Sequence, residues 1–193
     1  MALPSPFCFS DAQFFAYFEP MKTSRLTLRT LSQHDARRIA ALAGDWDVAR
    51  MTGRIPYPYS ATAALQWVSD LADGEVVYGI DHLGELIGIC GFSRKDESSA
   101  EIGYWIGKPY WGNGFATEAA DAVMSYGFTK AGVKRFTCSH FTDNPGSARV
   151  AAKLGFRATG PCTGWSEARN QQLPTLTYER RRPWTIALKA LAS

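Results

Sequence analysis

The sequence lacks the features that mark secreted, membrane-spanning or nucleic-acid-binding proteins. Only four cysteines occur in 193 residues, and no two have CxxC spacing, so a reduced, cytoplasmic protein is expected. No apolar run approaches the roughly 18 residues of a membrane span. Residues 1–20 contain no Lys or Arg, the basic start that a secretory signal requires. The net charge is only +3 and the basic residues are dispersed, which argues against a nucleic-acid partner.

The composition is that of an ordinary globular protein with one sizeable core. Hydrophobic residues make up 46% of the chain and charged residues 20%, and a length of 193 residues favours a single domain. Residues 1–20 are rich in Phe and Pro and are predicted to be an appendage, with a short helix capped by Ser10 and stopped by Pro20. The folded domain is expected to comprise residues 21–193, and Met21 is an alternative start of the chain.

Apolar residues alternate with polar ones in several short segments, and other segments have helical spacing. The alternating segments predict strands at residues 25–31, 75–81, 85–92, 100–107, 133–141 and 175–181. Capping and stop residues predict helices at residues 32–44, 45–53, 60–74, 116–131 and 144–155. The second, third and fourth of these strands are joined by connections of hairpin length. The order predicts an α+β fold, with a mixed sheet and helices rather than a pure βαβ alternation.

A glycine-rich turn stands between the strand that ends at Gly107 and the helix that begins near Ala116. Gly112 and Gly114 leave the nearby backbone N–H groups uncovered, and a helix N-terminus attracts anions. The turn therefore predicts a phosphate or pyrophosphate site, although a tight turn without a ligand would have the same spacing. A Walker loop is excluded because no Gly-Lys-Ser/Thr ending follows. A dinucleotide fingerprint is excluded because Thr117 replaces its third small residue.

Four segments occur in the order and at the separations of one known family. They are TSRLTLRTL at residues 23–31, EIGYWIGKPYWGNG at 101–114, PYWGNGFATEA at 109–119 and DNPGSARVAAKLGF at 143–156. On these segments the sequence resembles the GNAT superfamily of acetyl-CoA-dependent N-acetyltransferases, and in particular the branch that acetylates the N-termini of ribosomal proteins. The resemblance covers residues 22–184. Pro109 stands where the superfamily often has Gln or Arg, and the segment after Gly160 matches only loosely.

The resemblance implies a mostly antiparallel sheet with a V-shaped split between two neighbouring parallel strands, in which acetyl-CoA lies. It assigns the pantetheine arm to the strand end and to Asn144, and the pyrophosphate to the glycine turn. The implied cofactor-binding residues are Trp105, Ile106, Gly107, Trp111, Gly112, Asn113, Gly114, Phe115, Ala116 and Asn144. Ser147 matches the position that protonates the leaving thiolate, and no metal is expected. From capping rules alone, Asn144 and Ser147 are equally consistent with a plain helix start.

The general base is less clearly indicated, because an α-amino group with a pKa of about 8 needs little help to become neutral. Glu101 on the cofactor strand and His140 at the end of the next strand are candidate bases, and a water chain is an alternative. A sheet-face salt bridge for Glu101 and a satisfied polar contact for His140 are the competing interpretations. Glu167 is a third candidate. Cys90 and Cys138 are expected to be buried and inert, which argues against a covalent acyl-cysteine.

The resemblance, together with these residues, implies direct acetyl transfer from acetyl-CoA to a primary amine within a ternary complex. The first expected acceptor is the N-terminal amine of a protein or peptide. A small or antibiotic-like amine, or a coenzyme A-binding module without catalysis, is the alternative. Trp46, Tyr57, Tyr59 and Trp67 are expected at one lip of the acceptor groove, unless they are ordinary core aromatics. The protein is expected to be a monomer or a homodimer.

Overall fold

One eight-stranded sheet organises the computed structural model, which describes residues 19–71 and 75–183. Its strand order is β1-β2-β3-β4-β5-β6-β8-β7, and every neighbouring pair is antiparallel except β5 and β6. The strands are β1 (Met21–Lys22), β2 (Thr27–Arg29), β3 (Glu75–His82), β4 (Glu85–Arg94), β5 (Ser99–Ile106), β6 (Arg135–Phe141), β7 (Arg157–Ser166) and β8 (Gln171–Arg181). The α+β fold predicted from the sequence is confirmed. The helix predicted before Pro20 falls within residues 1–18 and therefore outside the described residues.

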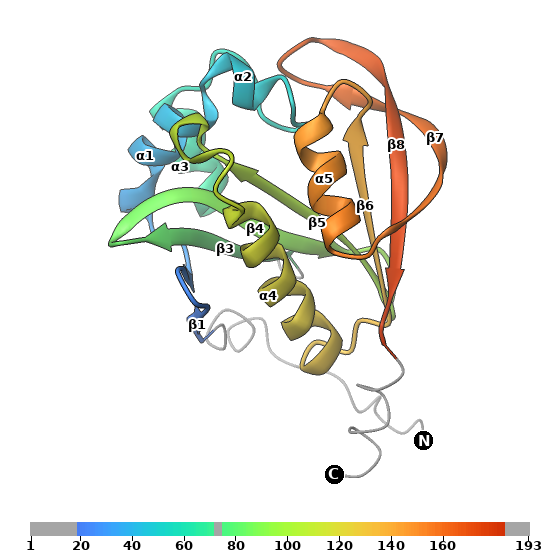
Figure 1. Ribbon diagram of the computed structural model, residues 1–193. Coiled ribbons are helices and arrows are strands. Elements are labelled where there is room, and N and C mark those ends of the chain that lie inside the picture. The colour runs from blue at the N-terminus through green and yellow to red at the C-terminus, as the bar shows by residue number, and fades with distance from the viewer. Residues whose placement is uncertain (1–18, 72–74, 184–193) are drawn as a thin grey trace, which may run out of the picture.

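Helices cover both faces of the sheet (Figure 1). They are α1 (Ala36–Ala43), α2 (Trp46–Ala49), α3 (Ala61–Ser69), α4 (Phe115–Thr129) and α5 (Pro145–Lys153), with short 3-10 turns η2 (Gln33–Asp35) and η3 (Lys108–Tyr110). The larger core joins α4 and α5 to one sheet face, and a smaller core joins α1 and α3 to the other. No helix within the described ranges is long and apolar enough to cross a membrane.

Side-chain caps explain where the predicted helices begin. Ser60 accepts a hydrogen bond from the N–H of Ala63 at 3.0 Å, and Asn144 accepts one from the N–H of Ser147 at 3.0 Å. Each bond satisfies one of the N–H groups that a helix leaves without an internal partner. The predicted starts of α3 and α5 are therefore confirmed. Helix α3 ends at Ser69, several residues before the predicted stop.

The long strand β7 was not predicted from the sequence. It pairs only with β8, at the edge of the sheet, and most of its side chains are exposed. An edge strand that buries neither face has no apolar alternation, and it tolerates Pro161 and Gly164, which would disfavour a central strand. The last predicted strand also begins earlier than expected, because β8 starts at Gln171 to pair with β7.

The parallel strands β5 and β6 pair over three positions only and then diverge. Their register joins Ser99 to Arg135, Ala100 to Phe136 and Glu101 to Thr137. Beyond Glu101, β5 continues to Ile106 and β6 to Phe141 without pairing to each other. The expected V-shaped split is therefore present, and the backbone of β5 faces it with N–H and C=O groups that β6 does not use.

Candidate active site

Two hollows lie at the split between β5 and β6. The loop cleft, lined by the end of β5, the glycine turn and α5, has a volume of about 390 Å³. The sheet cavity lies over the face of β3, β4 and β5 that α1 and α3 flank, and its volume is about 600 Å³. Both are lined by Met51, Thr52, Tyr104, Trp105 and Ser147. The two hollows therefore meet at this junction.

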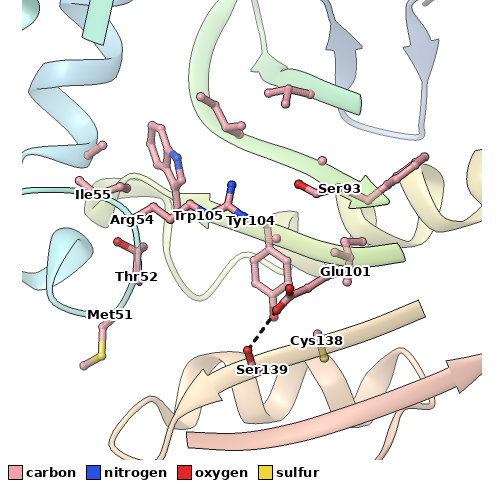
Figure 2. Close-up of a pocket in the computed structure, with 18 of the residues that line it drawn as sticks. Met51, Thr52, Arg54, Ile55, Ser93, Glu101, Tyr104, Trp105, Cys138 and Ser139 are labelled. Carbon is pink, nitrogen blue, oxygen red and sulfur yellow. Dashed lines mark hydrogen bonds between the residues drawn. The ribbon is translucent and has the colours of Figure 1, made fainter. Parts of the chain in front are cut away.

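The side chains of successive β5 residues point to opposite faces of the sheet, because side chains alternate along a strand. Figure 2 shows Tyr104 and Trp105 leaving β5 in opposite directions. Tyr104 packs against the larger core with α4 and α5, whereas Trp105 packs against the smaller core with α1 and α3. Both residues nevertheless line both hollows, so the end of β5 belongs to each of them.

The aromatic residues expected at the acceptor groove divide into two pairs. Tyr59 and Trp67 line the sheet cavity. Trp46 and Tyr57 do not line it; they are 43% and 50% exposed and pack edge to face, with ring centroids 5.0 Å apart. Only the first pair can contact a molecule inside the cavity.

The glycine turn leads directly into α4. Gly112 and Gly114 have φ angles of 80° and 81°, a left-handed conformation that other residues adopt only with strain. A Cβ atom at Gly112 would meet no atom within 4 Å, so the turn is open as well as tight. The N–H groups of residues 112–117 have no acceptor among the described residues. They form a concave row of donors at a helix N-terminus, which is an anion-binding arrangement.

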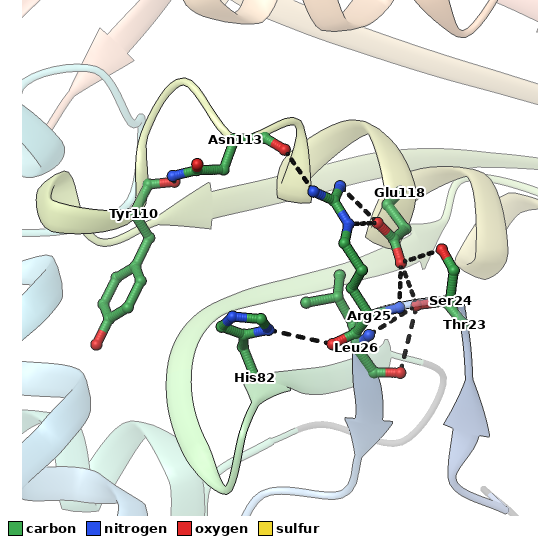
Figure 3. A network of polar contacts seen from close by, with 8 residues as sticks. All are labelled: Thr23, Ser24, Arg25, Leu26, His82, Tyr110, Asn113 and Glu118. Carbon is green, nitrogen blue, oxygen red and sulfur yellow. Dashed lines mark hydrogen bonds and ion pairs between the residues drawn. The ribbon is translucent and has the colours of Figure 1, made fainter.

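An ion pair ties this turn to the start of the domain (Figure 3). Glu118, in the first turn of α4, accepts hydrogen bonds from Thr23 Oγ1 at 2.6 Å, Arg25 Nε at 2.7 Å and Ser24 Oγ at 3.1 Å. Arg25 also donates from Nη1 to the carbonyl of Asn113 at 3.0 Å. The arginine therefore bridges the glycine turn and the helix that follows it.

The charge of Glu118 is strongly stabilised by these contacts. Burial alone would raise the pKa of the carboxyl, since its side chain is only 15% exposed. Hydrogen bonds from Thr23, Arg25 and Ser24 outweigh burial and lower the pKa to about 2. Glu118 is therefore ionised at any ordinary pH.

Helix α5 brings Asn144 and Ser147 to the other side of the loop cleft. The side chain of Asn144 accepts from the N–H of Ser147 and donates to the carbonyl of Met51 at 3.4 Å. Ser147 lines both hollows together with Tyr104, a phenol whose pKa is raised by burial. The hydroxyl of Ser147 thus lies at the junction between the two hollows.

Most of the predicted cofactor residues gather in one place. Those that line the loop cleft are Trp105, Ile106, Trp111, Gly112, Gly114, Phe115, Ala116 and Asn144. Gly107 and Asn113 do not line it. A Cβ atom at Gly107 would lie 2.7 Å from Leu42 Cδ2, so this glycine permits close packing against α1.

Two basic residues in the loop cleft were missed in the sequence. Arg149 and Lys153 of α5 both line it. They are four residues apart, which places them on one face of a helix, and this spacing after the Asn144 cap is the signal that could have revealed them. Both are exposed cations beside the donor row of the glycine turn, where they would attract phosphate groups.

Two of the candidate bases, Glu101 and His140, have partners. Glu101 forms an ion pair with Lys95 Nζ at 2.6 Å and accepts from Ser139 Oγ at 3.3 Å. His140 is buried, with Nδ1 2.8 Å from the carbonyl of Phe141 and Nε2 3.2 Å from the hydroxyl of Tyr178. These contacts match the competing interpretations, a salt bridge and a satisfied polar residue, although both side chains line the sheet cavity. Glu167 is exposed and lines neither hollow.

The buried thiols are poor nucleophiles. Burial raises the pKa of Cys138 to about 12 and also raises the pKa of Cys90, so both remain protonated near neutral pH. Among the described residues, no group of three or more His, Cys, Asp or Glu is placed to hold a metal ion.

Comparison with known proteins agrees with this geometry. The family model described as an acetyltransferase (GNAT) domain matches residues 25–157. The uncharacterized N-acetyltransferase p20 of Bacillus licheniformis is 30% identical over 83% of this chain and 94% of its own length. The ribosomal-protein-serine acetyltransferase of Escherichia coli is 35% identical over 39% of this chain and 44% of its own length. RimL, a ribosomal α-N-protein acetyltransferase solved in complex with coenzyme A, has a TM-score of 0.75 at 19% identity, covering 84% of this chain and 98% of that one.

Proposed function

The chain belongs to the GNAT family and is an acetyl-CoA-dependent N-acetyltransferase, and from this premise we propose that it acetylates the N-terminal α-amine of a protein or peptide. The observation that carries the proposal is the junction of the two hollows at Tyr104, Trp105 and Ser147. A donor in the loop cleft and an acceptor in the sheet cavity would meet there. The partial similarity to a ribosomal-protein-serine acetyltransferase supports a protein as the acceptor.

The residues of the loop cleft fit acetyl-CoA. The uncovered N–H groups of the glycine turn would hold its pyrophosphate, and the cations Arg149 and Lys153, which line the same cleft, would attract its phosphates. The backbone of β5 beyond Glu101, which β6 leaves unpaired, would bind the extended pantetheine arm. This arrangement directs the thioester toward Ser147.

Deprotonation of the acceptor amine needs little assistance from a general base. An α-amine with a pKa of about 8 is partly neutral at neutral pH, so its nitrogen can attack the thioester after water removes the proton. A C–N bond forms and the C–S bond breaks. Backbone N–H groups at the end of β5 would stabilise the oxyanion, and the hydroxyl of Ser147 would donate a proton to the thiolate. Glu101 and His140 remain candidates for receiving the amine proton across the sheet cavity.

A thiol-release assay with acetyl-CoA tests the proposal. The panel contains short peptides with free N-termini, the same peptides with blocked N-termini and an internal lysine, and small amines. We expect thiol release only with free α-amines, with mass spectrometry placing the acetyl group on the first nitrogen. Activity confined to lysine side chains or small amines would contradict the proposal. Silence across the panel would favour a coenzyme A-binding module without catalysis.

A further inference from the structure

Two glycines lie side by side on neighbouring strands in the floor of the sheet cavity. On this face the strands align in cross-strand rows, and one row joins Glu75, Ser93 and Glu101. The next row joins Val77, Gly91 and Gly103. All six positions line the sheet cavity. A polar row is therefore followed by a row that has almost no side chain.

The two glycines have different reasons for being there. A Cβ atom at Gly91 would lie 2.2 Å from the carbonyl oxygen of Val76, so the sheet itself requires glycine. A Cβ atom at Gly103 would meet no atom of the described residues within 4 Å, and its backbone has no positive φ angle. Neither packing nor backbone geometry explains the absence of a side chain at Gly103.

Gly103 is distinct among the strand glycines of the described residues. Cβ atoms at four others would lie less than 3.0 Å from a neighbouring atom: Gly79, Gly88, Gly91 and Gly164. Gly160 has a φ angle of 148°, which favours glycine. A glycine within a strand weakens the sheet, because it adds backbone entropy and packs nothing. At Gly103 neither a close contact nor a special backbone conformation within the protein explains why this loss of sheet stability is accepted.

The position of Gly103 indicates what the space is for. It precedes Tyr104 and Trp105, which line both hollows, and it lies beyond Glu101, where β6 no longer pairs with β5. An acceptor whose nitrogen reaches the junction from the sheet cavity would place its next carbon above Gly103. In an N-terminal residue this carbon is branched, since it carries both a side chain and a carbonyl group.

We propose that Gly103 is a specificity-determining position that gives the acceptor room for a substituent on the carbon bearing its amine. The inference rests on the proposed function, because a branched amine is the acceptor that it names. A side chain at residue 103 would enter this space, and its Cβ atom would meet no atom of the described residues within 4 Å. It would exclude branched acceptors and leave unbranched ones reactive.

The test compares the wild-type protein with Gly103→Ala and Gly103→Val on three peptides that differ only in a first residue of Gly, Ser or Leu. In Gly103→Val we expect the ratio of kcat/KM for the Leu peptide to that for the Gly peptide to fall by about tenfold or more, since one lost methylene-sized space is worth about that much. Gly103→Ala should have a smaller effect. The KM for acetyl-CoA should be unchanged, and the melting temperature should not fall, because Val favours strands.

Two results would overturn the inference. An unchanged Leu-to-Gly ratio would show that the acceptor does not approach Gly103. An equal loss with all peptides, together with a raised KM for acetyl-CoA, would assign the space to the donor instead. If the wild-type protein acetylates small amines but no peptide, the proposed function fails, and a linear butylamine compared with its amine-branched isomer then decides the role of Gly103 independently.

Discussion

Replacing Glu118 by Gln tests whether the start of the domain holds the glycine turn in its anion-binding shape. Gln has nearly the same size but no charge, and its amide offers one acceptor oxygen instead of two. The contacts from Thr23, Ser24 and Arg25 would therefore be weakened or lost. Arg25, released from the carboxylate, would hold the carbonyl of Asn113 less firmly.

The magnitude follows from the pKa of Glu118. Its fall from 4.5 to about 2 on folding corresponds to about 3 kcal/mol, at roughly 1.4 kcal/mol for each pH unit. Arg25 is 46% exposed, so solvent screens part of this energy, and we expect a loss of about 2 kcal/mol near neutral pH. Because the folded pKa is depressed, the stabilisation is fully present above pH 4.5 and is lost as the pH falls through about 2.

Urea denaturation of wild type and Glu118→Gln at several pH values measures this effect. The difference in unfolding free energy should be greatest near neutral pH and should narrow steadily below pH 4.5. The KM for acetyl-CoA should rise more than kcat falls, because the turn is the proposed binding site of the donor. Glu97→Gln is the matched control, since Glu97 is exposed and its side chain has no partner among the described residues. A stability difference that is independent of pH, or equal in both variants, would refute the reasoning.

Three further substitutions test the remaining parts of the site. Gly114→Asp should abolish acetyl-CoA binding in calorimetry, because it places a carboxylate in the donor row at a φ angle of 81°. Asn144→Ala should lower the unfolding free energy by about 1 kcal/mol through loss of the α5 cap, and should also raise the KM for acetyl-CoA. Ser147→Ala should lower kcat by about a hundredfold with little change in acetyl-CoA affinity, since its hydroxyl would act only on the leaving thiolate.

Two of these substitutions, Gly114→Asp and Asn144→Ala, have a control elsewhere in the fold. Gly132→Asp places the same residue at a φ angle of 70° away from both hollows, and it should bind acetyl-CoA normally. Ser60→Ala removes the comparable cap of α3 and should cost similar stability without affecting the KM for acetyl-CoA. Ordinary binding by Gly114→Asp, an unchanged KM in Asn144→Ala, or full turnover in Ser147→Ala would each remove that residue from the proposed site.

Local signals in the sequence were sufficient for much of the fold and for the glycine turn. The caps Ser60 and Asn144 act on N–H groups three residues away, so their effect is visible in a short segment. The positive φ angles of Gly112 and Gly114 belong to the same class, because they reflect the conformational freedom of single residues. Such features depend on neighbours in the chain and were predictable.

Contacts between distant segments could not be predicted in this way. Arg25 and Glu118 are 93 residues apart, and nothing in either segment indicates that they meet. The partner of His140 is Tyr178, on a strand that the sequence indicates only weakly. The free space above Gly103 depends on how strands and helices from distant parts of the chain surround it, so the glycine alone had no meaning in the sequence. These arrangements are products of tertiary packing.

Because β5 pairs with β6 over only a few residues, the sheet consists of two parts that are weakly connected to each other. Strands β1 to β5 form one part of the sheet, and β6, β8 and β7 form the other. Only three residue pairs connect the edges of these two parts in the described residues. An extended pantetheine arm bound along β5 would connect the two parts of the sheet, and this connection would be lost when the coenzyme leaves. Any ligand that binds only the folded state stabilises it, by about 2.7 kcal/mol at a hundredfold excess over its Kd. The bound coenzyme would therefore help to stabilise the folded structure in which it reacts.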